Sequence, residues 1–160
     1  MTFRASIVVG TVLLTAAIVK AAAAGDVAYP ADYRTFQHVK STLVGPENKG
    51  FAGNGGLHHF YANPAGMDGY RTGTFSDGAI LIDDLVAFTA DEAGLSHEGA
   101  RRRVAVMVKD TKKFADSGGW GFEIFKGDGR DASLTDAGRA ACYACHKTAG
   151  DAAVFTKYRP

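Results

Sequence analysis

Apolar and polar residues alternate along the middle of the chain with the period of two that is typical of half-buried β-strands. The first such stretch, 58–61, ends at turn-forming residues in 63–66, and further apolar runs follow at 79–85, 103–109 and 120–125. These patterns predict antiparallel strands. In the last two runs every second residue is apolar: Val104, Val106 and Val108, then Trp120, Phe122 and Ile124.

The two ends of the domain follow a helical period instead. Tyr33, Phe36 and Val39 recur every three residues within 31–43, which predicts an amphipathic helix there. A second helix is expected to start near Ser133, with Thr135 and Asp136 as further N-cap candidates, and to run to residue 146. The predicted fold class is therefore α+β, an antiparallel β-sheet with flanking helices, one of them at the C-terminus.

Residues 1–24 have the order of a secretory signal peptide: a positive charge at Arg4, an apolar run over 5–19 and small residues at 21–24. Cleavage after Ala24 would leave residues 25–160 as a single exported domain, which we expect in the periplasm. Lys20 lies unusually late in the apolar run, so an uncleaved anchor remains the alternative.

The charge of residues 25–160 is close to neutral. Removing Arg4 and Lys20 leaves 16 basic and 17 acidic residues, a formal charge of −1. Nucleic-acid binding needs a basic face, so no nucleic-acid partner is expected. The run Arg101-Arg102-Arg103 is interpreted as a solvated stretch at a strand start, with contact to an acidic group of a cofactor as the alternative.

The strongest chemical signal is the segment Cys142-Tyr143-Ala144-Cys145-His146. Two cysteines three residues apart, followed directly by histidine, have the spacing that binds c-type haem: the thiols form thioethers with the vinyl groups and the imidazole binds iron. One covalently attached haem c is expected, held by the C-terminal helix with His146 as the metal ligand. The chain has no other cysteine.

Other uses of the two cysteines fit less well. A structural zinc site needs four ligands, a disulfide leaves the adjacent histidine unexplained, and a thioredoxin-like redox pair needs a βαβ context. Fourteen residues follow His146, and none is Met or His, so a second iron ligand is expected upstream. The candidates are Met67, Met107, His38, His58, His59 and His97.

A helical bundle with C-terminal haem attachment is excluded, because 19 of the 20 glycines lie in residues 25–160 and a bundle interior resists glycine. The chain instead resembles the cytochrome P-460 family, which includes the cytochromes c′-β. The resemblance extends over most of 30–160, and its sequence blocks occur in the family's order. They are YRTF at 33–36, HHFYANP at 58–64, GYRTGTF at 69–75, VMVKD at 106–110, GGWGF at 118–122 and ACYACH at 141–146.

The resemblance implies a homodimeric antiparallel-sheet fold with a haem bound by the C-terminal histidine. Hydroxylamine-oxidising members have a lysine cross-linked to the porphyrin, where this chain has Thr74, and no lysine lies between Lys49 and Lys109. This departure favours the cytochromes c′-β, which bind nitric oxide beneath a phenylalanine cap. The candidates for that cap are Phe51, Phe60 and Phe75.

Further residues are candidates for supporting roles. Glu98 is the preferred proton acceptor, with Asp83 and Asp84 as alternatives, and Arg71 is a candidate partner for a haem propionate. His58 and His59 should point to opposite faces of their strand.

Three functions follow from these observations: a cytochrome that binds nitric oxide or another small nitrogen ligand, an oxidase acting on hydroxylamine, or an electron carrier with two axial ligands and a redox partner.

Overall fold

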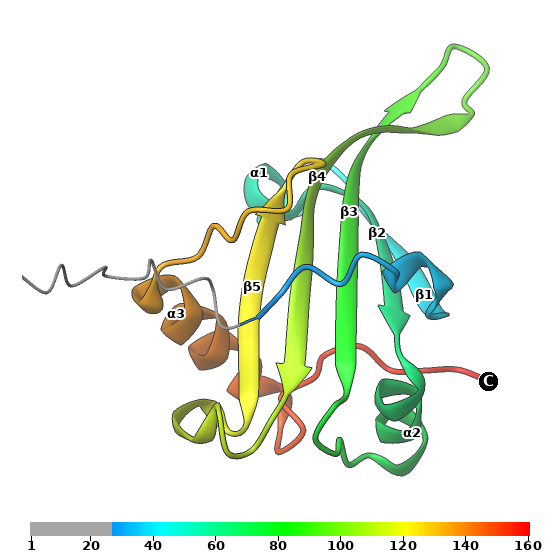
Figure 1. The fold of residues 1–160 in the computed structure, drawn as a ribbon. Coiled ribbons are helices and arrows are strands. Elements are labelled where there is room, and N and C mark those ends of the chain that lie inside the picture. The colour runs from blue at the N-terminus through cyan, green and yellow to red at the C-terminus, as the bar shows by residue number, and fades with distance from the viewer. Residues whose placement is uncertain (1–26) are drawn as a thin grey trace, which may run out of the picture.

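The computed structural model describes residues 27–160, which form one five-stranded antiparallel sheet and three α-helices (Figure 1). Each strand pairs with its neighbours in sequence, in the order β1-β2-β3-β4-β5. The α+β fold class is confirmed. The strands are β1 (Gln37–Val44), β2 (Gly56–Ala62), β3 (Ile80–Ala90), β4 (Ser96–Lys109) and β5 (Trp120–Lys126), and the helices are α1 (Phe51–Asn54), α2 (Pro64–Thr72) and α3 (Asp136–His146).

All four strands predicted from alternation are present, but β3 and β4 are longer than the pattern indicated. Their hairpin projects beyond the other strands in Figure 1. Residues 91–100 in this hairpin are exposed and carry no alternating burial, since no second layer covers them. Hydrophobic periodicity cannot reveal a strand that buries neither face.

The predicted helix over 31–43 is wrong. Tyr33–Thr35 form one 3₁₀ turn and Gln37–Val44 form β1, which pairs antiparallel with β2. Tyr33 and Phe36 pack in one hydrophobic cluster, whereas Val39 belongs to the other. The apolar residues that suggested one helical face thus serve two different faces of the sheet.

The sheet has a hydrophobic core on each face. On one side, the N-terminal segment crosses the strands in Figure 1, and Val27 and Tyr33 pack against Ile82, Val104 and Phe125. On the other side, α2, α3 and the C-terminal segment cover the sheet. Its core includes Met67, Phe75, Leu81, Trp120 and Phe122.

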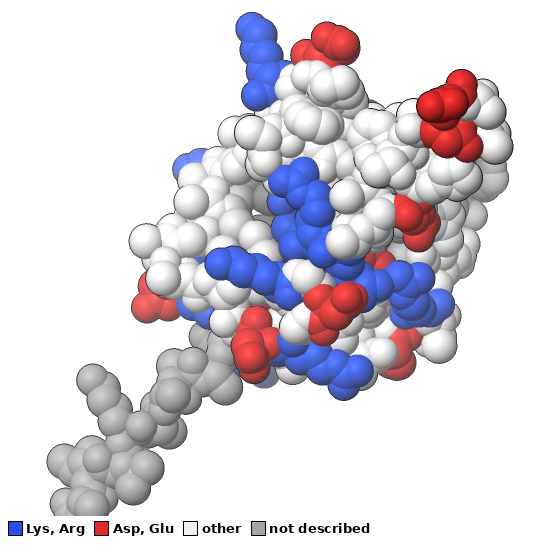
Figure 2. Space-filling model, turned by 90° about the horizontal axis from the view of Figure 1, so that it is seen from above, with Lys and Arg blue, Asp and Glu red and all other residues white. Residues whose placement is uncertain are grey.

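The arginine run lies within β4 rather than at a solvated strand start. Arg101 pairs with the buried Asp84 at 2.8 Å and with Asp128 at 2.5 Å. The partners of Leu85 and Val86 are Arg103 and Arg101, so Arg102 is an extra residue in β4. Figure 2 shows basic and acidic side chains interspersed on the face seen from above. Arg101 is neutralised by acids of other segments, whereas Arg102 and Arg103 donate mainly to oxygens in or next to α1. Charge counting along the chain cannot detect contacts of this kind.

Within residues 27–160, no helix is both long enough and apolar enough to cross a membrane. The predicted signal peptide, residues 1–24, lies outside the described residues.

Candidate haem-binding site

The haem-attachment motif forms the last turns of α3, as predicted. Thr135 is the N-cap, and its hydroxyl accepts a hydrogen bond from the N–H of Gly138. Residues three and four apart lie on the same side of a helix, which brings Cys142, Cys145 and His146 to one cavity. Both cysteines are free thiols, so the structure does not support a disulfide between them.

Glu123 fixes the start of this helix to the edge strand β5. Its buried carboxylate accepts hydrogen bonds from the N–H groups of Ile124, Ser133 and Leu134 at 2.8–3.0 Å. The Arg139 guanidinium on α3 donates to its second oxygen at 2.7 Å. Burial by itself raises the pKa of Glu123, but these donors outweigh burial and lower it below its ordinary value. The carboxylate is therefore a charged anchor for α3.

The His146 ring is held in one tautomer. Its Nδ1–H donates to the carbonyl of Ala153 at 2.9 Å, which leaves the Nε2 lone pair available for iron. The rings of Phe122 and Phe155 flank the imidazole, each with its centroid 5.2 Å away. Ala153 has φ = 54°, the one non-glycine residue with positive φ among those described. This left-handed turn directs the carbonyl toward His146.

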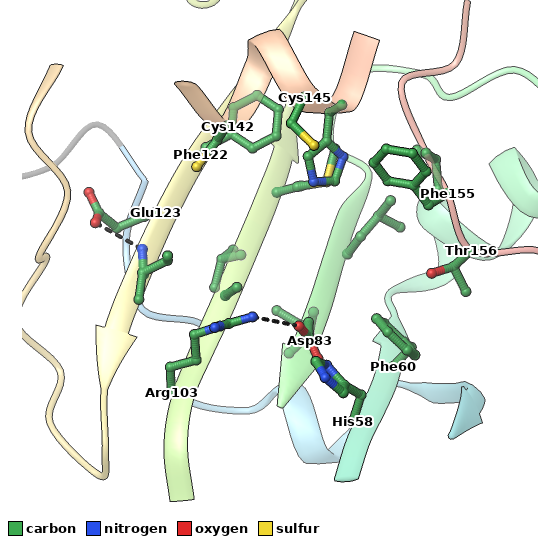
Figure 3. A pocket seen from close by; sticks show the side chains of 18 of the residues that line it. His58, Phe60, Asp83, Arg103, Phe122, Glu123, Cys142, Cys145, Phe155 and Thr156 are labelled. Atoms are coloured by element: carbon green, nitrogen blue, oxygen red, sulfur yellow. Dashed lines mark hydrogen bonds and ion pairs between the residues drawn. The ribbon is translucent and has the colours of Figure 1, made fainter. Parts of the chain in front are cut away.

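The cavity beside His146 has a volume of about 520 Å³ and lies between α3, the C-terminal segment and the sheet (Figure 3). Its walls are mostly apolar, which suits a porphyrin. Tyr70 also lines it, and burial raises the pKa of this phenol to about 12 despite its hydrogen bond with Thr156. The apolar lining includes Phe60, Leu81, Met107, Phe122, Val154 and Phe155.

Three ionisable side chains form the polar end of the cavity: His58, Asp83 and Arg103 (Figure 3). His58 Nδ1 lies 2.8 Å from the Asp83 carboxylate and its Nε2 lies 2.8 Å from the carbonyl of Asn54. Both partners are acceptors, so both ring nitrogens donate when the ring is protonated, and the arrangement favours the imidazolium. Burial lowers the pKa of His58, but these contacts raise it above its ordinary value overall.

Only one predicted cap residue lines this cavity. Phe60 does, whereas Phe51 is half-buried on α1 and Phe75 is buried in the core, where its ring packs against Tyr70 and Trp120. Phe155 closes the cavity beside His146 instead. Sequence reasoning missed it because an aromatic residue in the irregular C-terminal segment carries no periodic signal.

The other predicted site residues lie outside the cavity lining. Thr74 is exposed after α2, and Arg71 is an exposed residue of α2 paired with Asp68 at 3.0 Å. Glu98 is exposed and contacts His59 at 2.8 Å, away from the cavity that His58 lines. The two histidines thus face opposite sides, as predicted.

The structure also separates the six candidates for a second iron ligand. His58 and Met107 line the cavity; Met67 is in the core, and the other three histidines are elsewhere. Both His58 nitrogens are already engaged. Met107 is the remaining candidate that lines the cavity.

These residues fit a c-type haem: two free thiols on one helix turn, an imidazole with Nε2 available and a largely apolar cavity. Zinc fits less well. Among residues 27–160, no three His, Cys, Asp or Glu side chains are grouped to hold a metal ion.

A comparison with curated protein sequences gives no match. The family profile for Cytochrome P460 matches residues 30–156, which contain the sheet, α3 and the haem-attachment motif. The chain therefore belongs to the cytochrome P460 family and is a haem cytochrome of that family.

Proposed function

We propose that this chain is an exported monohaem cytochrome that binds a small nitrogen ligand such as nitric oxide, as the cytochromes c′-β do. The observation that carries the proposal is that one imidazole nitrogen in the lining, His146 Nε2, is free to bind iron, while Met107 is the one further candidate ligand in the lining. His146 offers a free Nε2, whereas both ring nitrogens of His58, the other histidine in the lining, are occupied. A haem held by His146 would supply an iron able to bind a small molecule.

The apolar lining supports a neutral ligand over a charged one. Transfer of an ion into an apolar cavity costs far more than transfer of a small neutral molecule. Phe60 and Phe155 give the walls this character. The resemblance also implies a homodimer, which stays a prediction that light scattering of the purified protein can test.

The test is the optical spectrum of the purified ferrous protein with and without nitric oxide. We expect a high-spin ferrous spectrum that changes on addition of nitric oxide. A low-spin, six-coordinate ferrous spectrum would contradict the proposal and favour an electron carrier. In that case Met107→Leu, which removes the thioether of the remaining lining candidate, should convert the spectrum to high spin.

The role of His146 is tested separately. His146→Ala should abolish imidazole ligation while both thioether bonds remain, as shown by spectra and by the mass of the haem-bearing chain. His59→Ala is the matched control, because His59 contacts Ser41 and Glu98 away from the cavity. Identical spectra for wild type and His146→Ala would refute the ligand assignment.

Oxidation of hydroxylamine is the second candidate, and one observation favours it. Asp83 supplies a carboxylate in the cavity lining, where a proton acceptor would be needed, whereas Glu98 and Asp84 do not line it. No lysine contributes to that lining, and the residue matched to the cross-linking lysine, Thr74, is exposed. Hydroxylamine-dependent reduction of an added electron acceptor, lost in Asp83→Asn, would favour this function, and a protein mass showing an extra bond to the porphyrin would strengthen it.

A further inference from the structure

Arg103 is fixed at the polar end of the cavity by the short helix α1. Its Nη1 donates to the carbonyl of Gly53 at 3.0 Å and its Nη2 to the side-chain oxygen of Asn54 at 2.9 Å. Its Nε is buried and has no hydrogen-bond partner among the described residues. The side chain as a whole is 20% exposed and lines the cavity, so its positive charge is accessible to a ligand there.

The charges around Arg103 do not cancel. Asp83 is committed to His58 at 2.8 Å, and its other oxygen is 3.6 Å from Arg103 Nη2, which is beyond hydrogen-bond distance. With His58 as imidazolium, two cations face one carboxylate, which leaves one net positive charge. Glu123, the other acid in the lining, is saturated by Arg139 and backbone N–H groups. One further anion would neutralise this end of the cavity.

The polar cluster lies across the cavity from the cysteines. In Figure 3, Cys142 and Cys145 are on α3 at one side, and Arg103, Asp83 and His58 are on the strands opposite. A haem carries its vinyl groups and its two propionates on opposite edges of the ring. Attachment of the vinyl edge to the cysteines therefore turns the carboxylates away from α3.

We propose that Arg103, supported by His58, binds a propionate carboxylate of the haem. The proposal rests on haem attachment at α3 and not on which small ligand the iron binds. It replaces Arg71, the candidate from sequence, because Arg71 is exposed on α2, pairs with Asp68 and does not line the cavity. A guanidinium beside a carboxylate forms a charge-assisted hydrogen bond and holds the carboxylate in its charged form.

The test compares Arg103→Gln with Arg102→Gln in the holoprotein. Arg102 is the matched control, since it also donates to carbonyls at α1, those of Ala52 and of the C-cap Gly55, without lining the cavity. In Arg103→Gln we expect a shift of the propionate bending bands in the resonance Raman spectrum. We also expect the reduction potential to depend on pH where the wild-type potential is constant, because the freed propionate then titrates. Arg102→Gln should have the propionate bending bands and the pH-independent reduction potential of wild type.

Several outcomes would overturn the proposal: equal shifts in both variants, a shift in Arg71→Gln alone, or unchanged propionate bands in Arg103→Gln. Suppose instead that added nitrite changes the spectrum of wild type but not of Arg103→Gln, and that the propionate bands of Arg103→Gln equal those of wild type. This result would show that Arg103 and His58 bind a free oxyanion rather than a propionate. If Arg103→Gln fails to retain haem, Arg103→Lys keeps the charge and should give a smaller shift in the same direction. Nitric oxide binding by the same variants tests the proposed function independently.

Discussion

Glu123 connects the sheet to the helix that carries the haem motif, so its replacement tests how α3 is held. Glu123→Gln keeps the shape of the side chain but removes its charge. The carboxylate is fully buried, with Arg139 Nη2 at 2.7 Å and three backbone N–H donors. Removing one partner of a buried ion pair costs about 3–5 kcal/mol. Because the Arg139 side chain is 24% exposed, we expect a loss near the lower end, about 3 kcal/mol.

The measurement is the free energy of unfolding of the holoprotein from urea titrations followed by far-UV circular dichroism. Glu98→Gln is the control, because Glu98 pairs with His59 on the surface and is 57% exposed, so its loss should cost less than about 1 kcal/mol. Equal losses in the two variants would refute the anchoring role of Glu123.

The stability of wild type and of Glu123→Gln should also differ in its dependence on pH. The folded pKa of Glu123 is below its ordinary value, so its contribution is present above the unfolded pKa of about 4.3 and is lost as pH falls through the folded pKa. Wild type should therefore lose stability below about pH 4.3 more steeply than Glu123→Gln does. Parallel curves in this acid range would contradict the lowered pKa.

Three further predictions concern other parts of the molecule. The pKa of His58 in the folded protein is raised, so its ion pair with Asp83 stabilises the protein below the unfolded pKa of about 6.5. This stabilisation is lost as pH rises through the folded pKa. NMR titration of the imidazole should give a midpoint above 6.5. Tyr33→Phe removes the 2.6 Å hydrogen bond to the buried Asp84 and should cost about 2 kcal/mol in urea unfolding, whereas no measurable cost would refute that contact. Cys142→Ala and Cys145→Ala should each leave one thioether, so mass spectrometry should find haem still attached to both variants, and the double variant should carry none covalently.

The confirmed predictions are those that depend only on residues close together in the sequence. Alternation revealed β2 and β5, since the large side chains Trp120 and Phe122 pack on one face of β5, although the other face of β5 is buried as well. The start of α3 was expected near Ser133 and lies at Asp136; the cap is Thr135, one of the further candidates, whose hydroxyl accepts from the helix N-terminus locally. The helix over 31–43 failed because Tyr33 and Val39 pack on opposite faces of the sheet, and three-residue spacing does not distinguish one helical face from two sheet faces.

The cavity was beyond sequence reasoning because its polar end is assembled from distant segments. From the sequence, Asp83 was an alternative to Glu98, and Arg103 belonged to a basic run for which contact with an acidic group of a cofactor was the alternative interpretation. The register of β3 on β4 and the extra residue Arg102 decide that Arg103 points to the cavity and that Arg101 meets Asp84.

The sequence by itself predicted haem attachment, because Cys142, Cys145 and His146 lie within five consecutive residues and a helix fixes their relative positions. Only the tertiary structure decided which residues line the cavity beside them. Strand pairing, the left-handed turn at Ala153 and the C-terminal segment with Phe155 bring together groups far apart in the chain. Contacts of this kind depend on register and packing, which no local pattern of residue types encodes.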